Sequence, residues 1–177
     1  MRRTLPIVML AAATLALTAQ GALAQGFAAR RGARENAAGG VTAGESRAVV
    51  GENGGAAAGR RGFASDGDGN AVGGSGQAFK GPNGSEGARA GRWSHSADGT
   101  TNHESGGAYR GANGSATTSG SASRDASGNT TANRSTNATA NSGAAYAGDT
   151  SYNSGSGVSH SGTCTNSSGA VVPCPTH

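Results

Sequence analysis

FKGPNGSEGARAG, residues 79–91, decides the fold of this chain, because its Asn83-Gly84 pair belongs to a regular series. A short polar residue followed by Gly stands at nine nearly regular positions, and the glycines of these nine pairs stand 12 to 15 residues apart. The turn glycines of this series are Gly54, Gly69, Gly84, Gly99, Gly114, Gly128, Gly143, Gly157 and Gly169. Asn-Gly and Asp-Gly supply the positive φ angles of tight hairpin turns. The series therefore predicts a β-hairpin repeat with a period of about 15 residues.

A second set of small residues lies half a period away from the first. Its members are Gly76, Gly91, Gly106, Gly120, Ser135, Gly148 and Gly162. If these residues also form turns, each period holds two arms of about five residues, the length of short strands. We therefore expect an all-β antiparallel meander or ribbon of about eighteen short strands. A two-layer β-solenoid and a largely disordered chain are the alternatives, because Gly, Asn and Ser are poor strand formers.

The apolar residues predict a thin seam instead of a deep core. A bulky residue stands five or six positions before several of the turn glycines, as at Phe63, Phe79, Trp93 and Tyr109. After residue 24 the chain has no Leu or Ile, and Val and Phe together number ten. A chain this poor in large apolar residues cannot build an ordinary enzyme core. No nucleophile–base pair, paired carboxylates or phosphate loop stands on a rigid scaffold, so we expect no enzymatic activity and no cofactor.

The N-terminus is typical of a bacterial secretory signal peptide. Arg2 and Arg3 precede an apolar run over residues 5–17, and small residues follow up to Ala24. This pattern predicts a signal helix over residues 1–24 that is cleaved after Ala24. The run is too short to span a bilayer comfortably, and we expect no membrane span after cleavage. The expected location is outside the cytoplasm: periplasmic, at the cell surface or extracellular.

Composition divides the rest of the chain into three parts. Residues 25–45 read as a flexible basic lead-in, because they precede the glycine series and carry three arginines. Residues 46–162 hold the Gly/Ser/Asn-rich repeats of about 15 residues. Residues 163–177 form a terminal hairpin that contains both cysteines of the chain.

Those cysteines, Cys164 and Cys174, predict a disulfide. Each stands five residues from Gly169, so a hairpin symmetric about that glycine places them directly opposite each other. An oxidising compartment favours the bond. Closing the loop stabilises the fold by about 2.5–3 kcal/mol in the chain-entropy estimate. Pro173 and Pro175 lack backbone donors, so we interpret the ending as a clasp that caps the repeat.

Two short patterns suggest metal ligands. The sequence DGDGN, residues 66–70, resembles the start of a calcium loop, but Gln77 stands where that loop needs a bidentate Glu. We interpret it as a turn. His95 and His103 lie four residues on either side of Gly99 and are expected to face each other across a hairpin. Two imidazoles bind a transition metal only weakly, so we expect no metal site here, and these histidines remain the only candidates.

Arginines offer a possible contact with polyanions. They cluster at Arg30, Arg31 and Arg34, and again at Arg60 and Arg61. Nucleic-acid grooves need dense basic patches interleaved with stacking aromatic residues, and the Tyr and Trp residues do not interleave with these clusters. We therefore expect no specific nucleic-acid recognition.

The chain resembles secreted Gly/Ser/Asn-rich repeat proteins of proteobacteria. The resemblance is carried by FKGPNGSEGARAG (79–91), YRGANGSATTSG (109–120) and CTNSSGAVVPCP (164–175). It implies an exported repeat protein and no particular activity.

Together these observations predict a secreted, non-enzymatic structural or interaction protein of the cell surface, periplasm or extracellular matrix. Exposed strand edges and flat faces of small residues favour self-association, so the expected partners are other copies of the chain or other surface and matrix components. The alternative function is weak binding of a metal through His95 and His103, or of polyanions through the arginines.

Overall fold

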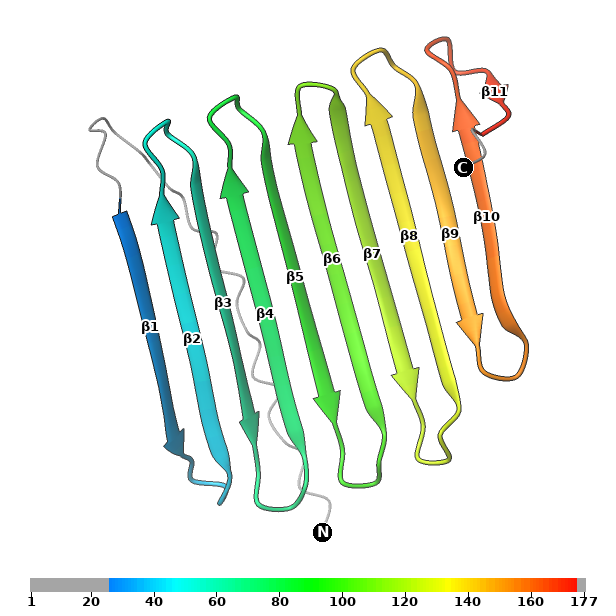
Figure 1. The fold of residues 1–177 in the computed structure, drawn as a ribbon. Coiled ribbons are helices and arrows are strands. Elements are labelled where there is room, and N and C mark those ends of the chain that lie inside the picture. The colour runs from blue at the N-terminus through cyan, green and yellow to red at the C-terminus, as the bar shows by residue number, and fades with distance from the viewer. Residues whose placement is uncertain (1–25, 175–177) are drawn as a thin grey trace.

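The computed structural model describes residues 26–174, which form one open antiparallel sheet of eleven strands in sequence order (Figure 1). The strands are β1 (Gly26–Glu35), β2 (Val41–Val50), β3 (Ala56–Ser65), β4 (Ala71–Lys80), β5 (Glu86–His95), β6 (Thr101–Gly111), β7 (Gly114–Arg124), β8 (Thr130–Ala140), β9 (Ala145–Asn153), β10 (Gly157–Thr165) and β11 (Val171–Val172). The prediction of an all-β antiparallel meander is confirmed, and residues 26–174 form neither a two-layer solenoid nor a coil. The expected signal helix lies outside the described residues.

The number of strands differs from the expected eighteen, because the second set of small residues does not form turns. Gly76, Gly91 and Gly106 lie in the middle of β4, β5 and β6, and the other members of the set lie within β7 to β10. Each period therefore contains one strand of nine to eleven residues instead of two short arms, β11 excepted. Glycine in the middle of a strand is unfavourable on its own, so these positions need a packing reason.

All nine predicted turn glycines have positive φ, from 75° at Gly84 to 148° at Gly114. No other residue type between residues 26 and 174 has positive φ, which rules out the two-residue type I′ turn that an Asn-Gly pair suggests. In the β2–β3 turn, the Gly54 amide donates to the Gly51 carbonyl at 3.2 Å, and the Gly51 amide donates to the Gly55 carbonyl at 2.8 Å. This is a three-residue loop with a left-handed glycine as its last residue.

The repeat starts earlier than expected. The supposed flexible lead-in over residues 25–45 contains β1 and half of β2, joined by a turn at Gly39 with φ 76°. Ala38 precedes this glycine, so the search for a polar residue before Gly missed it. The polar residue of the turn is Asn36 instead, whose Oδ1 accepts hydrogen bonds from the amides of Ala38 and Gly40.

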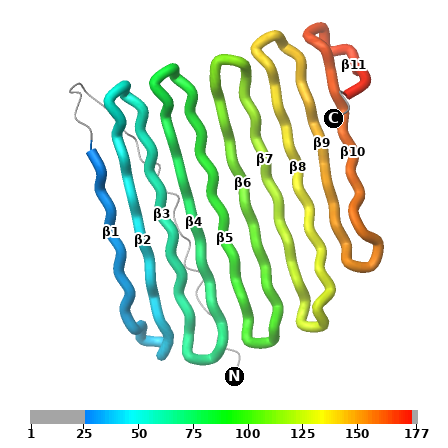
Figure 2. The backbone as a smooth tube through the Cα atoms, in the orientation of Figure 1, coloured from blue at the N-terminus to red at the C-terminus, as the bar shows by residue number. Residues whose placement is uncertain are grey.

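Turns alternate between the two ends of the sheet, as Figure 2 shows. The turns at one end share the sequence Gly-x-Asn-Gly at 51–54, 81–84 and 111–114, at intervals of 30 residues. Those at the other end include Asp66-Gly-Asp-Gly69 and Ser96-Ala-Asp-Gly99. The structural unit is therefore a pair of strands of about 30 residues, and the 15-residue period is half of it.

The sheet is a single layer. No hydrophobic side chain is buried among residues 26–174, and the expected seam of bulky residues is largely exposed. A β-sheet of a globular domain normally buries one face against a second layer. In this part of the chain, no helix has the length and hydropathy of a membrane span.

Candidate interaction faces

The two faces of the sheet differ because alternate residues of each strand point to opposite sides. Directly paired residues share a side, so the strand register assigns each residue to a face. Every described aromatic residue falls on the same side, which we call the aromatic face. These residues are Phe27, Phe63, Phe79, Trp93, Tyr109, Tyr146 and Tyr152. They form two rows that cross the strands, one near each end of the sheet.

Glycines provide the floor on which several rings lie. A methyl group added at Gly73 would stand 2.5 Å from Nε1 of Trp93, so the indole covers that glycine. Phe79 covers Gly87 in the same way, where an added Cβ would stand 2.6 Å from Cε1 of the ring. These two strand glycines therefore have a packing role that turn chemistry does not supply.

The rings remain accessible to solvent. The exposed fractions of Trp93 and Tyr109 are 38% and 47%, although both lie against the sheet. The rings of Phe79 and Tyr109 stack with their centroids 6.3 Å apart and their planes 28° apart, across the intervening strand β5. Rings that lie over glycine offer their outer surfaces to a partner.

A trough runs across the strands between the two aromatic rows. It consists of two adjoining depressions of about 620 and 520 Å³ that share Gln77, Arg89, Gly107, Thr118 and Arg134. Its floor is made of small residues, since the strand positions between the rows hold glycines such as Gly59, Gly91 and Gly107.

Three exposed arginines line this trough: Arg47 on β2, Arg89 on β5 and Arg134 on β8. None of them has a described carboxylate within ion-pair distance. Arg89 donates to the Gln77 amide oxygen at 3.0 and 3.3 Å, and Arg134 donates to the Thr118 hydroxyl at 3.1 Å. Both acceptors are neutral, so the trough carries uncompensated positive charge.

The opposite side, which we call the alanine face, is flat and lacks rings. Six paired alanines cross β1 to β6 in one row: Ala28, Ala48, Ala58, Ala78, Ala88 and Ala108. Gly, Ser, Thr and Asn occupy most of the other strand positions of this face.

The carboxylates on the alanine face have partners in the plane of the sheet. Arg92 on β5 binds Glu104 on β6 at 2.6 Å, and Arg110 on β6 binds Glu86 on β5 at 2.8 Å. Asp149 accepts a hydrogen bond from the Ser135 hydroxyl on the neighbouring strand. Its acidic side chains therefore have partners within the face itself, unlike the arginines of the trough.

The expected disulfide between Cys164 and Cys174 is present, with the two Cα atoms 5.3 Å apart. The cysteines are not directly opposite, however, because Cys164 pairs with Val172. The left-handed glycine at position 169 makes the hairpin symmetric about Ser168 instead, which moves Cys174 two residues past the pairing position.

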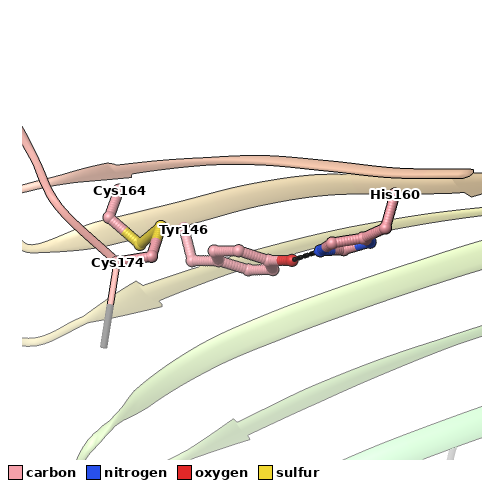
Figure 3. Close-up of a disulfide and its surroundings, with 4 residues drawn as sticks. All are labelled: Tyr146, His160, Cys164 and Cys174. Atoms are coloured by element: carbon pink, nitrogen blue, oxygen red, sulfur yellow. Dashed lines mark hydrogen bonds between the residues drawn. A yellow bond between two sulfur atoms is a disulfide. The ribbon is translucent and has the colours of Figure 1, made fainter. Parts of the chain in front are cut away.

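This disulfide lies beside Tyr146 on the aromatic face, since Cys164 is the direct partner of Tyr146 across β9 and β10 (Figure 3). The Tyr146 hydroxyl is 3.4 Å from Nε2 of His160, and Nδ1 of His160 is 2.8 Å from the Thr150 hydroxyl oxygen. Pro173 follows β11, whereas Pro175 lies outside the described residues. The clasp closes only the end of β10, because β11 pairs with Cys164 and Thr165 alone.

The metal candidates occupy one face but are not brought opposite each other. His95 pairs with Thr101 and His103 pairs with Trp93, again because the hairpin is symmetric about the residue before Gly99. Within residues 26–174, His, Cys, Asp and Glu side chains form no group of three or more that could hold a metal ion.

The DGDGN stretch forms a turn, as interpreted. Asp66 accepts hydrogen bonds from the Asn70 side chain at 2.7 Å and from the amides of Asn70 and Asp68 at 2.8 and 3.0 Å. These bonds, that of the Asn70 side chain above all, lower the pKa of the Asp66 carboxyl from its ordinary value. The Asp66 carboxylate therefore accepts hydrogen bonds within its own turn, in agreement with the interpretation of DGDGN as a turn.

The arginine clusters that the sequence singled out are divided between the faces. Arg30 and Arg60 belong to the alanine face, and their chain neighbours Arg31 and Arg61 to the aromatic face. Arg61 is paired with Glu45 at 2.7 Å. Sequence reasoning instead missed Arg47, Arg89 and Arg134, which stand alone in the sequence and meet only through the sheet. Alternation along strands of ten residues is the signal that would have found them.

Comparison with protein-family models, with curated proteins and with solved structures finds no match to this chain.

Proposed function

We propose that this chain is an exported, non-enzymatic structural protein that functions by self-association through the alanine face. The observation that carries the proposal is the single-layer sheet, in which no described hydrophobic side chain is buried. A one-layer sheet gains little from the hydrophobic effect, so a second layer supplied by another copy would stabilise it.

The alanine face suits such packing. Small side chains such as Ala58, Ala78 and Ala88 let two sheets approach closely, as in the stacked sheets of silk-like assemblies. The in-plane pairs Arg92–Glu104 and Arg110–Glu86 neutralise charges within the face. Its basic residues without a described carboxylate partner, Arg30, Arg34 and Lys80, stand on the edge strand β1 or at the end of β4, away from the centre of the face.

The size of the face is also sufficient. Ten strands at 4.8 Å spacing and ten residues of strand length give about 1,500 Å² per face. Two copies packed face to face would bury about 3,000 Å² in total, within the range of obligate homodimers.

The disulfide between Cys164 and Cys174 is compatible with the proposed export, since such bonds persist in oxidising compartments. The alternative of a weak metal site through His95 and His103 is not favoured by their separate pairing partners. The alternative of a polyanion site at the clustered arginines is not favoured either, because those arginines point to opposite faces.

The test is the substitution Ala88→Arg, at an exposed position in the centre of the alanine row. A charged side chain there would separate two packed alanine faces, so we expect self-association to weaken at least about tenfold. Sedimentation velocity of the oxidised protein over a concentration series measures the change.

The matched control is Ala122→Arg, which adds the same charge to β7 on the aromatic face. We expect its self-association to stay close to that of the parent protein. A parent protein that remains monomeric at every concentration contradicts the proposed function, and equal effects of the two substitutions contradict the choice of face.

A further inference from the structure

We propose that the trough of the aromatic face binds an extended acidic polysaccharide. The inference goes beyond self-association and concerns the other side of the sheet. It rests on the proposed function in one respect: an exported protein meets acidic polysaccharides outside the cytoplasm.

The charge of the trough points to an anionic ligand. Arg47, Arg89 and Arg134 all line it, and no described carboxylate pairs with them. The only carboxylates on the aromatic face of the described strands are Glu35 and Glu45. Glu45 is paired with Arg61, and Glu35 lies at the end of the edge strand β1. A guanidinium group binds a carboxylate through two parallel hydrogen bonds, which suits uronic acid units.

The rings point to a ligand with flat apolar surfaces as well as charge. Phe79 and Tyr109 lie along one side of the trough, and Trp93 belongs to the row on the other side. Sugar rings present C–H faces that pack on aromatic side chains, whose outer surfaces are exposed here. Hydroxyl groups of Ser75, Ser105 and Thr118 within the trough can bond to sugar hydroxyls.

The spacing of the charges favours a polysaccharide over a nucleic acid. The three arginines stand on β2, β5 and β8, so they are about 14 Å apart along the trough at 4.8 Å per strand. Nucleic acid carries a phosphate about every 3.4 Å per strand and calls for a denser basic surface. A polymer of uronic acids can meet the sparse arginines with some of its carboxylates while the sugar units between them pack on the rings.

A second copy of the chain fits the trough poorly. Two aromatic faces packed together would bury the same unpaired arginines from both copies. Burying such charges without partners costs more than the rings gain. The alanine face has no rings, its carboxylates have partners within the face, and its flat rows of small residues suit that contact better.

The experiment uses the oxidised exported protein and oligogalacturonate as the probe, with neutral galacto-oligosaccharide of equal length for comparison. Titration calorimetry at fixed ionic strength gives the affinity, and the emission of Trp93, the only tryptophan, reports binding next to the trough. We expect oligogalacturonate to bind and to change the emission, and the neutral sugar to bind at least about tenfold more weakly.

The decisive variants change charge equally on the two faces. The triple variant Arg47→Gln, Arg89→Gln, Arg134→Gln removes the positive charge from the trough. All three side chains are exposed, so the sheet should keep its circular dichroism spectrum. The control variant Arg30→Gln, Arg34→Gln, Lys80→Gln removes three charges from the alanine face. We expect at least about a tenfold loss for the first and less than about threefold for the second.

Four outcomes overturn the proposal: absence of oligogalacturonate binding, equal losses in the two variants, tighter binding of oligothymidylate than of oligogalacturonate, and Trp93 becoming buried on self-association alone. Of these outcomes, only burial of Trp93 on self-association concerns how copies of the chain associate. It would contradict the choice of the alanine face but not self-association itself. The tyrosine substitution Tyr109→Ala gives an independent check, because a stacked sugar predicts weaker binding of both charged and neutral probes.

Discussion

The aromatic face and the alanine face are made from alternate residues of the same ten strands, yet they differ in every property that matters for association. The aromatic face carries rings, a trough and arginines without carboxylate partners. The alanine face carries methyl groups and in-plane ion pairs. Neither face is covered by a second layer, so the difference between their side chains does not serve the packing of a core. It sets instead what each face can bind.

Removing one strand or two should have the largest effect on self-association, because one strand is half of the structural unit and two strands are a whole unit. Deleting residues 54–83 removes β3 and β4 and joins Asn53 to Gly84, which restores the Gly-x-Asn-Gly turn. Deleting residues 54–68 removes β3 alone and joins Asn53 to Gly69. In the second variant Val50 of the alanine face pairs with Ala71 of the aromatic face, so every later strand presents the wrong side.

We expect the deletion of residues 54–68 to weaken self-association at least about tenfold, because it splits the alanine row between two sides. The deletion of residues 54–83 should stay within about threefold of the parent protein, since both faces remain continuous. Sedimentation velocity compares the two. If both variants associate equally well, the faces do not determine association.

Much of the fold followed from local backbone chemistry. Every glycine of the first series has positive φ, as a turn after Asn, Asp or Ser requires, whereas the second set that was also expected to form turns lies within strands. The hairpin order and the disulfide followed from the same series.

The errors share one cause, which is that glycine has two uses here. Gly39 forms a turn without a polar residue before it, and it was missed. Gly148 and Gly162 lie beneath the Tyr146 ring and looked like turns in the sequence. A turn glycine and a glycine under a ring cannot be told apart until the strand length is known. Strand length in turn decides which arginines share a face. The trough and its three arginines could therefore not be predicted from the sequence.

Two glycines of β4 sharpen the comparison between the faces. Gly73 lies under Trp93 on the aromatic face, and Gly76 lies on the alanine face with only the Arg89 carbonyl oxygen near an added Cβ, at 3.9 Å. Gly76→Ala should stabilise the sheet by about 0.5 kcal/mol, because alanine loses less conformational freedom on folding.

Gly73→Ala should be less favourable than Gly76→Ala by about 1 kcal/mol, because the new methyl group displaces the indole from the sheet. Urea unfolding gives the free energies, and the Trp93 emission should shift in the Gly73 variant alone. Identical emission spectra for the two variants would show that the indole does not lie on Gly73 in solution.

The smallest expected effect comes from pH and acts at the turns instead of at either face. Hydrogen bonds from the Asn70 side chain, from the Thr100 amide and from the Asn129 side chain lower the pKa values of Asp66, Asp98 and Asp125 below the ordinary 3.8. A carboxyl whose pKa is lower in the folded state than in the unfolded chain stabilises the fold above the unfolded pKa. That contribution is lost as the pH falls through the folded pKa, so stability should decline modestly below about pH 4.

These three carboxylates all belong to turns at the same end of the sheet, after β3, β5 and β7. Replacing them with Asn should flatten the decline, because an amide oxygen can accept the backbone hydrogen bonds of the turn without titrating, and the titrating bonds from the Asn70 and Asn129 side chains are removed. Asn166 shows this already, since its Oδ1 accepts from the amides of Ser168 and Ala170 at 3.0 Å each. Urea midpoints measured from pH 6 to pH 2.5 compare the triple variant Asp66→Asn, Asp98→Asn, Asp125→Asn with the parent protein. An acid decline of the same size in both proteins would assign the pH dependence to the strand carboxylates, and hence to the faces.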